Sequence, residues 1–182
     1  MTNSKKIIGI VGENASGKTT ATEYLKQKYG AMSFRFSDSL SDVLVRLHLE
    51  TTRANFQKLS TVLRQNFSED LLSKVIAEDV TASDAPIIIT EGVRRPSDIE
   101  YLQKLPGFFL IAIRADEKIR YERLLTRGEK PDDAMKTWEQ FVTEGQQESE
   151  QKISEIAATA GVTIDNSGSF DDLYRQLDKL CK

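Results

Sequence analysis

The chain has 182 residues, of which 39% are hydrophobic and 29% are charged, and its 28 acidic and 25 basic residues give a net charge of −3. This length predicts a single compact domain over residues 1–182. A mildly acidic chain is not expected to bind a nucleic acid polymer, which requires a concentrated positive surface. With one cysteine, Cys181, and one histidine, His48, the chain cannot build a disulfide framework or a zinc site from Cys and His alone.

The sequence gives no sign of a membrane segment. Its longest apolar run covers residues 108–113, whereas a transmembrane helix needs about 20 apolar residues. The first residues lack the pattern of a signal peptide. We therefore expect a cytoplasmic protein that acts without a membrane, as a monomer or a homodimer. His48 stands in the amphipathic run 43–49, where we expect a partly buried structural role.

Short apolar runs alternate along the chain with longer segments of helical periodicity. The runs, which are rich in β-branched and aromatic residues, cover 6–11, 32–36, 87–90, 108–113 and 162–164. Several are apolar almost throughout, as is typical of strands that are covered by helices on both faces of a sheet. Strands that alternate with helices are joined by crossover connections, so the sequence predicts an α/β fold with a parallel sheet.

A glycine-rich motif follows the first predicted strand. Residues 12–19 match the phosphate-binding pattern G-x-x-x-x-G-K-[ST]. In such a loop the backbone N–H groups surround phosphate oxygens, and the N-terminus of the following helix adds a positive dipole. We expect Lys18 to reach the β- and γ-phosphates of ATP, and the Thr19 hydroxyl to bind Mg²⁺. The predicted nucleotide-binding residues of this segment are Gly12, Glu13, Asn14, Ala15, Ser16, Gly17, Lys18, Thr19 and Thr20.

The phosphate loop alone does not identify the reaction, because GTPases, remodelling ATPases and small-molecule kinases share it. The sequence has no Asn-Lys-x-Asp guanine-binding motif in a usable position, and remodelling ATPases need a larger domain. These two observations favour a small-molecule kinase. The alternative of another class is a nucleotide-binding regulatory ATPase without a phosphate acceptor.

Charged residues follow the third predicted strand, at the edge where open parallel sheets bind their ligands. Glu91 can hold the hydration shell of Mg²⁺ or orient the attacking oxygen. Arg94 and Arg95 come next, and a pair of arginines can bind the phosphate of the acceptor. A surface ion pair between Glu91 and an arginine is the alternative interpretation.

Three other segments contribute candidate residues. Asp38, which follows the second predicted strand, can cap the next helix or face the acceptor. Arg64 lies in an expected acceptor-binding helical insert over residues 38–82, where it can bind the acceptor or simply be a surface residue. The turn after the last strand can frame the edge of an adenine with its backbone, which adds Asn166 and Gly168 to the nucleotide-binding residues.

Residues 116–128 have the pattern of a helix with acidic residues in its first turn. Arg123 and Arg127 are four residues apart, so they share one face of that helix. One guanidinium can stack on a nucleotide base, and the other can neutralise charge on the transferred phosphoryl group. Salt bridges to neighbouring glutamates are the alternative. The polar stretch 128–150 is expected to form a small helical lid with little core, or else a plain solvated hairpin.

In the order of these motifs the chain resembles the nucleoside monophosphate kinase-like P-loop proteins, in particular the archaeal adenylate kinase-like and dephospho-coenzyme A kinase-related proteins. The resemblance rests on the phosphate loop, on Ser37-Asp38, on 91–94, on 120–127 and on 166–168. It implies a three-layer P-loop NTPase fold whose five parallel strands have the order 2-3-1-4-5. It also implies that Arg123 lies over the adenine, that Arg127 contacts the phosphates of ATP and that Arg94 binds the acceptor.

The sequence thus predicts a single P-loop kinase domain that uses ATP and Mg²⁺. The predicted reaction moves the γ-phosphoryl group of ATP to a small-molecule acceptor, a nucleoside or deoxynucleoside monophosphate, with dephospho-coenzyme A as the alternative. The predicted catalytic residues are Lys18, Asp38, Glu91 and Arg127, and the predicted metal ligands are Thr19 and Glu91. The adenylate kinase signature Asp-Gly-x-Pro-Arg is absent, so adenosine monophosphate is not the expected acceptor.

Overall fold

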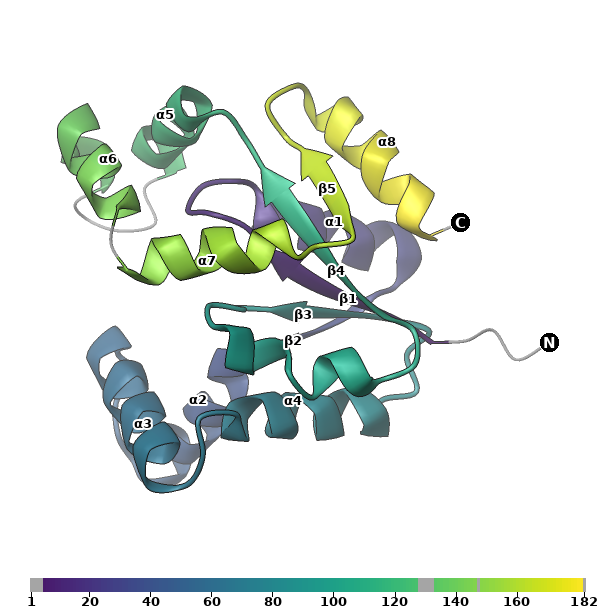
Figure 1. Cartoon of the computed structure of the whole chain (residues 1–182), viewed down its shortest axis with the longest axis vertical. Helices are drawn as coiled ribbons and strands as arrows, with labels where there is room; N and C mark the ends of the chain where they lie inside the picture. Colours follow the sequence, from purple (N-terminus) through teal and green to yellow (C-terminus); the bar gives the residue numbers. More distant parts are fainter. Residues whose placement is uncertain (1–4, 128–132, 147, 182) are drawn as a thin grey trace. The chain divides into compact units, whose positions relative to one another are not determined.

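The fold is known from a computed structural model, which describes residues 5–127, 133–146 and 148–181. Five strands form one parallel sheet in the order β2-β3-β1-β4-β5 (Figure 1). This result confirms the predicted α/β fold and its strand order. The strands are β1 (Lys6–Val11), β2 (Met32–Arg35), β3 (Ile87–Glu91), β4 (Phe108–Arg114) and β5 (Val162–Asp165).

The strand ends differ from the prediction by one residue. β2 ends at Arg35 rather than at Phe36, because Phe36 already begins the next helix. Each of the last three strands continues one residue further, to a charged residue. The reason is pairing: Arg35 pairs with Glu91, and Arg114 pairs with Asp165. Ladder pairing thus extends the strands into residues that hydropathy alone assigns to loops.

The chain divides into two compact units, one made of residues 1–9 and 31–109 and the other of residues 10–30 and 110–182. Among the described residues, no helix of either unit is long and apolar enough to cross a bilayer. The helices of the first unit are α2 (Phe36–Arg46), α3 (Arg53–Asn66) and α4 (Leu71–Ala82), followed by the 3₁₀ turns η1 (Pro96–Ile99) and η2 (Leu102–Lys104).

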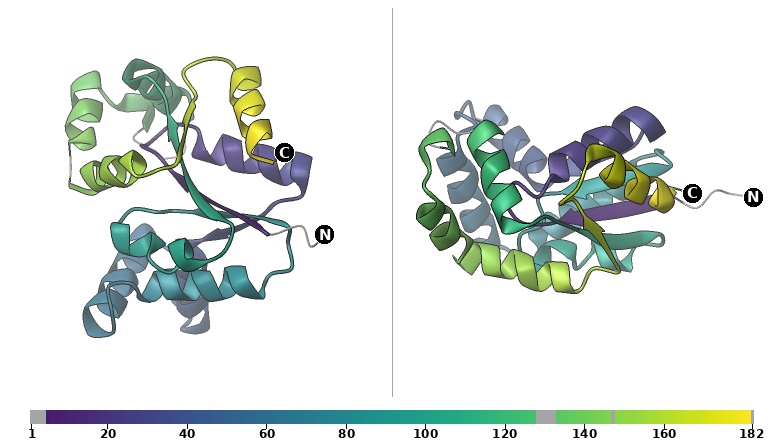
Figure 2. Two further views of the ribbon diagram at one scale, coloured as in Figure 1. Left: turned by 45° about the vertical axis from the view of Figure 1, so that its right-hand side comes forward. Right: turned by 90° about the horizontal axis from the view of Figure 1, so that it is seen from above.

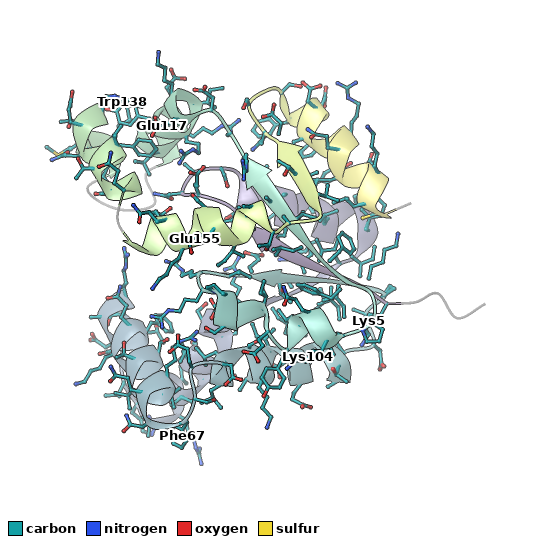
Figure 3. All side chains as sticks on the ribbon, in the orientation of Figure 1. Lys5, Phe67, Lys104, Glu117, Trp138 and Glu155 are labelled. Atoms are coloured by element: carbon teal, nitrogen blue, oxygen red, sulfur yellow. The ribbon has the colours of Figure 1, made fainter. Side chains whose placement is uncertain are left out.

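The three helices of the first unit are buried to different extents. α2 buries Phe36, Leu40 and Leu44, whose four-residue spacing places them on one face. α4 buries apolar residues along most of its length and packs on β2. In α3 the buried residue is Arg64, and Phe67, just beyond its last residue, is 73% exposed (Figure 3). The expected insert is therefore helical, and α3 is the least buried of its helices, with apolar residues that are at most half-buried.

The expectation of a partly buried His48 is wrong. His48 is exposed and has a φ of 56°, in the left-handed region. It lies just after α2, where its N–H bonds to the carbonyl oxygen of Val45 and the N–H of Leu49 bonds to that of Leu44. This arrangement satisfies the last carbonyls of the helix and turns the chain away. His48 thus ends a helix instead of filling a core.

The second unit contains five α-helices and a short 3₁₀ turn in its described part. Helices α1 (Lys18–Tyr29) and α8 (Phe170–Cys181) lie side by side in both views of Figure 2. Asp178 of α8 accepts hydrogen bonds from the hydroxyls of Tyr24 and Tyr29 and from the Lys28 ammonium, at 2.6–2.9 Å. α8 therefore clamps the helix that begins at the phosphate loop. The elements are α1 (Lys18–Tyr29), α5 (Glu117–Arg127), η3 (Asp133–Met135), α6 (Trp138–Gly145), α7 (Glu148–Ala158) and α8 (Phe170–Cys181).

The expected lid, residues 128–150, has more core than predicted. Its residues 128–132 and 147 lie outside the described part, but α6 carries a buried Phe141 that packs against Leu124 and Ala15. Trp138, labelled in Figure 3, joins this group with its ring 5.9 Å from that of Phe141. These aromatic side chains are separated by polar residues in the sequence, which explains why the segment reads as solvated.

Candidate nucleotide and acceptor sites

The phosphate loop is shaped by two close approaches of its glycines. A Cβ on Gly12 would lie 2.3 Å from the carbonyl oxygen of Ile113 in β4. Gly17 has a φ of 100°, and a Cβ there would lie 2.1 Å from Nδ2 of Asn166. No side chain fits at either position, and only glycine adopts the second conformation without strain. The loop can therefore bend tightly between β1 and α1.

Lys18 lies over this loop. Its Nζ donates hydrogen bonds to the carbonyl oxygens of Gly12 at 2.7 Å and Glu13 at 2.8 Å. The ammonium is thus placed at the mouth of the loop, where a bound anion would meet it. Thr19, in the first turn of α1, is exposed and can offer its hydroxyl to a ligand.

Several buried polar atoms of this unit lack a hydrogen-bond partner among the described residues. They include Oγ of Ser16 in the loop, Oδ1 of Asn166 beside it and Nη1 of Arg123 on α5. Buried polar atoms are almost always paired in folded proteins, so each unpaired one needs an explanation. Unpaired donors and acceptors of this kind can bind a polar ligand.

Asn166 has a second role that the sequence did not suggest. Its side chain is 2% exposed, and its Nδ2 donates to the carbonyl oxygen of Ser16 at 2.8 Å. Asn166 therefore braces the phosphate loop from β5. Gly168 lies in the following turn, beside the Asp172 carboxylate. Contact of this turn with an adenine stays a prediction.

Of the two predicted arginines of α5, the structure describes the side chain of Arg123. Arg123 is half-buried, and Arg127 is the last residue of the helix, with a side chain outside the described part. Their roles toward the base and the phosphates stay predictions. Arg120, one turn earlier on the same face, was not predicted as a site residue, although its guanidinium contacts the phosphate loop.

In the first unit, a charged pair lies at the carboxyl ends of β2 and β3. Nε of Arg35 is 3.4 Å from Oε2 of Glu91, whose side chain is 12% exposed. Oε1 of Glu91 is buried and has no hydrogen-bond partner among the described residues. One oxygen of Glu91 thus takes part in an ion pair, with Arg35 as the partner, but Glu91 is largely buried and not at the surface as the alternative interpretation had it. The other oxygen is unpaired among the described residues, and its role toward a metal or an acceptor stays a prediction.

Asp38 caps α2, which was one of its two predicted roles. Its carboxylate accepts a hydrogen bond from the backbone N–H of Arg35 at 2.8 Å. The side chain is exposed in the first turn of the helix, where a negative charge also stabilises the helix dipole. Its second predicted role, toward the acceptor, stays a prediction.

The loop after β3 is held by a residue that the sequence analysis missed. Oδ2 of Asp98 accepts hydrogen bonds from the backbone N–H groups of Arg94 and Arg95, at 2.8 and 2.9 Å. Asp98 is 3% exposed. The Arg94 guanidinium is exposed, and it makes no hydrogen bond or ion pair with the described residues. The Arg95 guanidinium instead bonds to Glu69 at 2.7 Å and thereby lowers the pKa of that carboxyl.

Arg64 does not point to solvent from the insert. It is 8% exposed, and its Nη2 lies 2.6 Å from Oδ1 of Asp98. Its Nη1 donates to the carbonyl oxygen of Glu69. The alternative of a plain surface residue is therefore wrong, because the side chain is buried and paired. A role of Arg64 in binding the acceptor stays a prediction. Arg64 holds Asp98, which in turn holds the backbone of Arg94.

The sequence of the chain is similar to that of several archaeal proteins. Residues 8–152 match the AAA domain family (AAA_18). The UPF0200 protein MJ1399 of Methanocaldococcus jannaschii is 32% identical over 178 residues, which cover 96% of this chain and 88% of that protein. A UPF0200 protein of Sulfurisphaera tokodaii is 28% identical over 177 residues, covering 97% and 96%.

Solved structures share the fold at low sequence identity. The protein TT1252 of Thermus thermophilus superposes with a TM-score of 0.64 at 16% identity and covers 98% of this chain and 97% of its own. Shikimate kinase of Aquifex aeolicus has a TM-score of 0.57 at 12% identity, covering 96% and 95%. The fold is therefore that of the P-loop kinases.

Proposed function

We propose that this chain, which belongs to the UPF0200 family and to the AAA domain family, is an ATP- and Mg²⁺-dependent phosphotransferase that acts on a small molecule. The observation that carries the proposal is the phosphate loop: glycines admit the tight bend, and the Lys18 ammonium lies at its mouth. Backbone N–H groups and a helix N-terminus in this arrangement bind phosphate.

The donor nucleotide would be held by the second unit. Lys18 would bind the β- and γ-phosphates, and Arg123 would contact the adenine with the guanidinium whose Nη1 is unpaired among the described residues. No cluster of three or more His, Cys, Asp or Glu side chains in the described chain could hold a metal unaided. Mg²⁺, which neutralises phosphate charge during transfer, would be bound by phosphate oxygens together with Thr19, and Glu91 stays a predicted metal ligand as the alternative to its role toward the acceptor.

The acceptor would be held by the first unit. Arg94 presents an exposed guanidinium from a loop whose backbone is fixed by Asp98, and such a group binds a phosphate through two parallel hydrogen bonds. Glu91 would orient the attacking oxygen. An acceptor that itself carries a phosphate, such as a nucleoside or deoxynucleoside monophosphate, suits these residues. Dephospho-coenzyme A is the second candidate.

Transfer would proceed by in-line attack of an acceptor oxygen on the γ-phosphorus. The bond from this phosphorus to the β,γ-bridging oxygen breaks and ADP leaves, while the acceptor proton passes to Glu91 or to solvent. In this chemistry catalysis comes from positioning and from neutralisation of charge. Arg127 would supply positive charge to the transferred group.

The match to the AAA domain family supports a second candidate of another class, a nucleotide-binding regulatory ATPase without an acceptor. ADP release distinguishes the two. We would incubate the protein with Mg²⁺-ATP and, in turn, each nucleoside and deoxynucleoside monophosphate and dephospho-coenzyme A, and follow ADP by a coupled assay. A phosphotransferase releases ADP at a rate that depends on one acceptor. A rate that no acceptor changes would favour the regulatory ATPase.

A further inference from the structure

The phosphate loop contains a residue whose charge opposes its expected ligand. Glu13 is the second residue of the loop, its side chain is 34% exposed, and its own carbonyl oxygen accepts a hydrogen bond from Lys18. A carboxylate within several ångströms of a bound triphosphate repels it, because charges near a protein surface are only partly screened. The loop needs a way to offset this repulsion.

Arg120 of α5 lies against this carboxylate. Its Nη2 is 3.4 Å from Oε2 of Glu13, and its Nη1 is 3.4 Å from the carbonyl oxygen of Asn14 in the same loop. Its Nε donates to the carbonyl oxygen of Ala115 at 3.2 Å, which ties the guanidinium to the connection between β4 and α5. One side chain thus contacts two consecutive residues of the loop.

The guanidinium is also fixed by packing. Arg120 is 9% exposed, and its Cζ lies 5.5 Å from the centre of the Phe141 ring on α6. Phe141 packs with Leu124 and with Ala15, which is itself a loop residue. A buried guanidinium is costly unless it is paired, so its placement between Glu13 and an aromatic ring indicates a specific role.

A second arginine lies near Glu13. Together with Gly12, Ser154 and Ala157, both Glu13 and Arg114 line a cavity of about 130 Å³ beside the loop. Arg114 is exposed at the end of β4, so it is the more strongly screened of the two arginines. The buried Arg120 is therefore expected to offset more of the negative charge of Glu13 than Arg114 does.

We propose that Arg120 is a positioning residue of the phosphate loop. It cancels the negative charge of Glu13 and holds Asn14, so that the loop accepts a polyanion. The inference rests on the proposed function, because it assumes that the loop binds the phosphates of ATP. If this inference is correct, the loss of phosphate affinity on removal of Arg120 depends on whether Glu13 is charged. For an arginine with a purely structural role, the loss would be the same with or without that charge.

The test compares Arg120→Met, Glu13→Gln and the double variant by isothermal titration calorimetry, with Mg²⁺-ATP and with tripolyphosphate, which lacks the base and sugar. We expect Arg120→Met to weaken both ligands by about tenfold or more, because the Glu13 carboxylate is left uncompensated. Glu13→Gln is expected to bind both ligands more tightly than wild type, because the positive charge of Arg120 is then no longer offset. The double variant returns to within about threefold of wild type.

Arg175→Met is the matched control, since it removes an arginine of α8 that pairs with Asp172 on the exposed surface, and it leaves both affinities unchanged. Two further variants serve if Arg120→Met fails to fold. Arg120→Lys keeps the positive charge and is expected to bind ATP within a few-fold of wild type. Arg120→Gln is expected to weaken ATP binding, and Glu13→Gln is expected to restore it. Equal weakening of the Arg120 variant with and without Glu13→Gln would overturn the inference. Failure of the wild-type protein to bind either ligand would instead overturn the proposed function.

Discussion

The phosphate loop in one unit and the loop after β3 in the other both follow a buried strand, but they are held in different ways. The first is shaped by backbone: Gly12 and Gly17 allow close approaches, and Asn166 bonds to a loop carbonyl. The second is held by charge, because Asp98 binds two backbone N–H groups and is itself paired with Arg64. In both loops the side chain placed to meet the expected ligand is positively charged: Lys18 in the first and Arg94 in the second.

This difference follows from what each loop would bind. A triphosphate offers many oxygens, so successive N–H groups and a helix N-terminus bind it, and the loop must have one fixed backbone path. A single phosphate or carboxylate on an acceptor is bound by one well-placed guanidinium. Its position then depends on how firmly the backbone of Arg94 is fixed. The substitutions below test this contrast, in order of expected effect.

Lys18→Ala removes the cation at the mouth of the phosphate loop. We expect turnover to fall by about a thousandfold or more, because the charge that stabilises the transferred phosphoryl group is lost. Stability should hardly change, since Lys18 is not part of a core. Steady-state kinetics and thermal unfolding measure the two effects. Lys26→Ala, which removes an ammonium from the same helix away from the loop, should leave turnover unchanged. Wild-type turnover of the Lys18 variant would contradict the assignment of the donor site.

Asp98→Ala breaks the buried pair that holds the second loop. Removal of the Asp98 carboxylate leaves the buried Arg64 guanidinium with the more distant Glu69 carboxylate, at 3.5 Å, and also leaves the backbone N–H groups of Arg94 and Arg95 without their acceptor. We therefore expect the free energy of unfolding to fall by about 3–5 kcal/mol. Urea denaturation measures this change. Glu100→Ala is the control, because it breaks an exposed pair with Lys104 and should cost less than about 1 kcal/mol. A similar small loss for both variants would show that the loop is not held by charge.

Arg94→Ala and Arg95→Ala separate two neighbouring arginines. Arg94 has an exposed guanidinium, whereas Arg95 is paired with Glu69. We expect loss of Arg94 to raise the KM for the acceptor by about 30-fold or more and to leave the KM for ATP unchanged. Loss of Arg95 should change the acceptor KM by only a few-fold. Initial-rate kinetics with both substrates varied decide, and a larger effect on the KM for ATP would move Arg94 to the donor site.

Arg123→Ala tests the base contact on α5. A guanidinium stacked on adenine acts equally before and during transfer, so its loss should raise the KM for ATP by about three- to tenfold and spare kcat. Lys118→Ala, at an exposed position on the opposite face of the same helix, is the control. A fall in kcat without a change in KM would assign Arg123 to the transferred phosphate instead.

The smallest effect concerns the clamp between α1 and α8. Donation from Lys28 and from Tyr24 and Tyr29 holds the pKa of Asp178 well below its usual range. A depressed folded-state pKa stabilises the protein above the unfolded value of about 4 and ceases to do so as the pH falls through the folded value. The difference in Tm between wild type and Asp178→Asn should therefore shrink from pH 7 to pH 2. Asp171→Asn, on the same helix, should show little difference at any pH.

A raised pKa in the same clamp gives a second, alkaline readout. The Asp178 carboxylate raises the pKa of Tyr29 to about 12. The neutral phenol is thus favoured in the folded state, so its contribution is present below pH 10 and is lost as the pH rises toward 12. Tyr29→Phe should flatten the fall in Tm over this interval. An unchanged alkaline profile would show that Tyr29 does not depend on Asp178.

The two loops also differ in how far the sequence could predict them. Gly12, Gly17, Lys18 and Thr19 act through backbone geometry within eight consecutive residues, so their spacing is itself the signal. The strand order was likewise predictable, through the resemblance that these motifs carry. The Arg35–Glu91 and Arg64–Asp98 pairs join segments that are distant in the sequence, and no local pattern links them.

Arg120 was missed for the same reason. It stands in the motif that carries the resemblance, yet its contacts with Glu13 and Asn14 exist only because α5 packs against the loop. An acidic residue within a phosphate loop was the one available signal, since it requires a cation elsewhere in the fold. The aromatic residues of α6 were missed because polar residues separate them along the chain.

Hydrogen–deuterium exchange tests most directly whether the phosphate loop binds the nucleotide and the loop after β3 binds the acceptor. The wild-type protein would be measured with Mg²⁺ and a non-hydrolysable ATP analogue, with the best acceptor, and with both. The account predicts that the analogue protects residues 12–20 and 115–127, and that the acceptor protects residues 91–98. Protection of residues 91–98 by the analogue alone, with no change at residues 12–20, would contradict it.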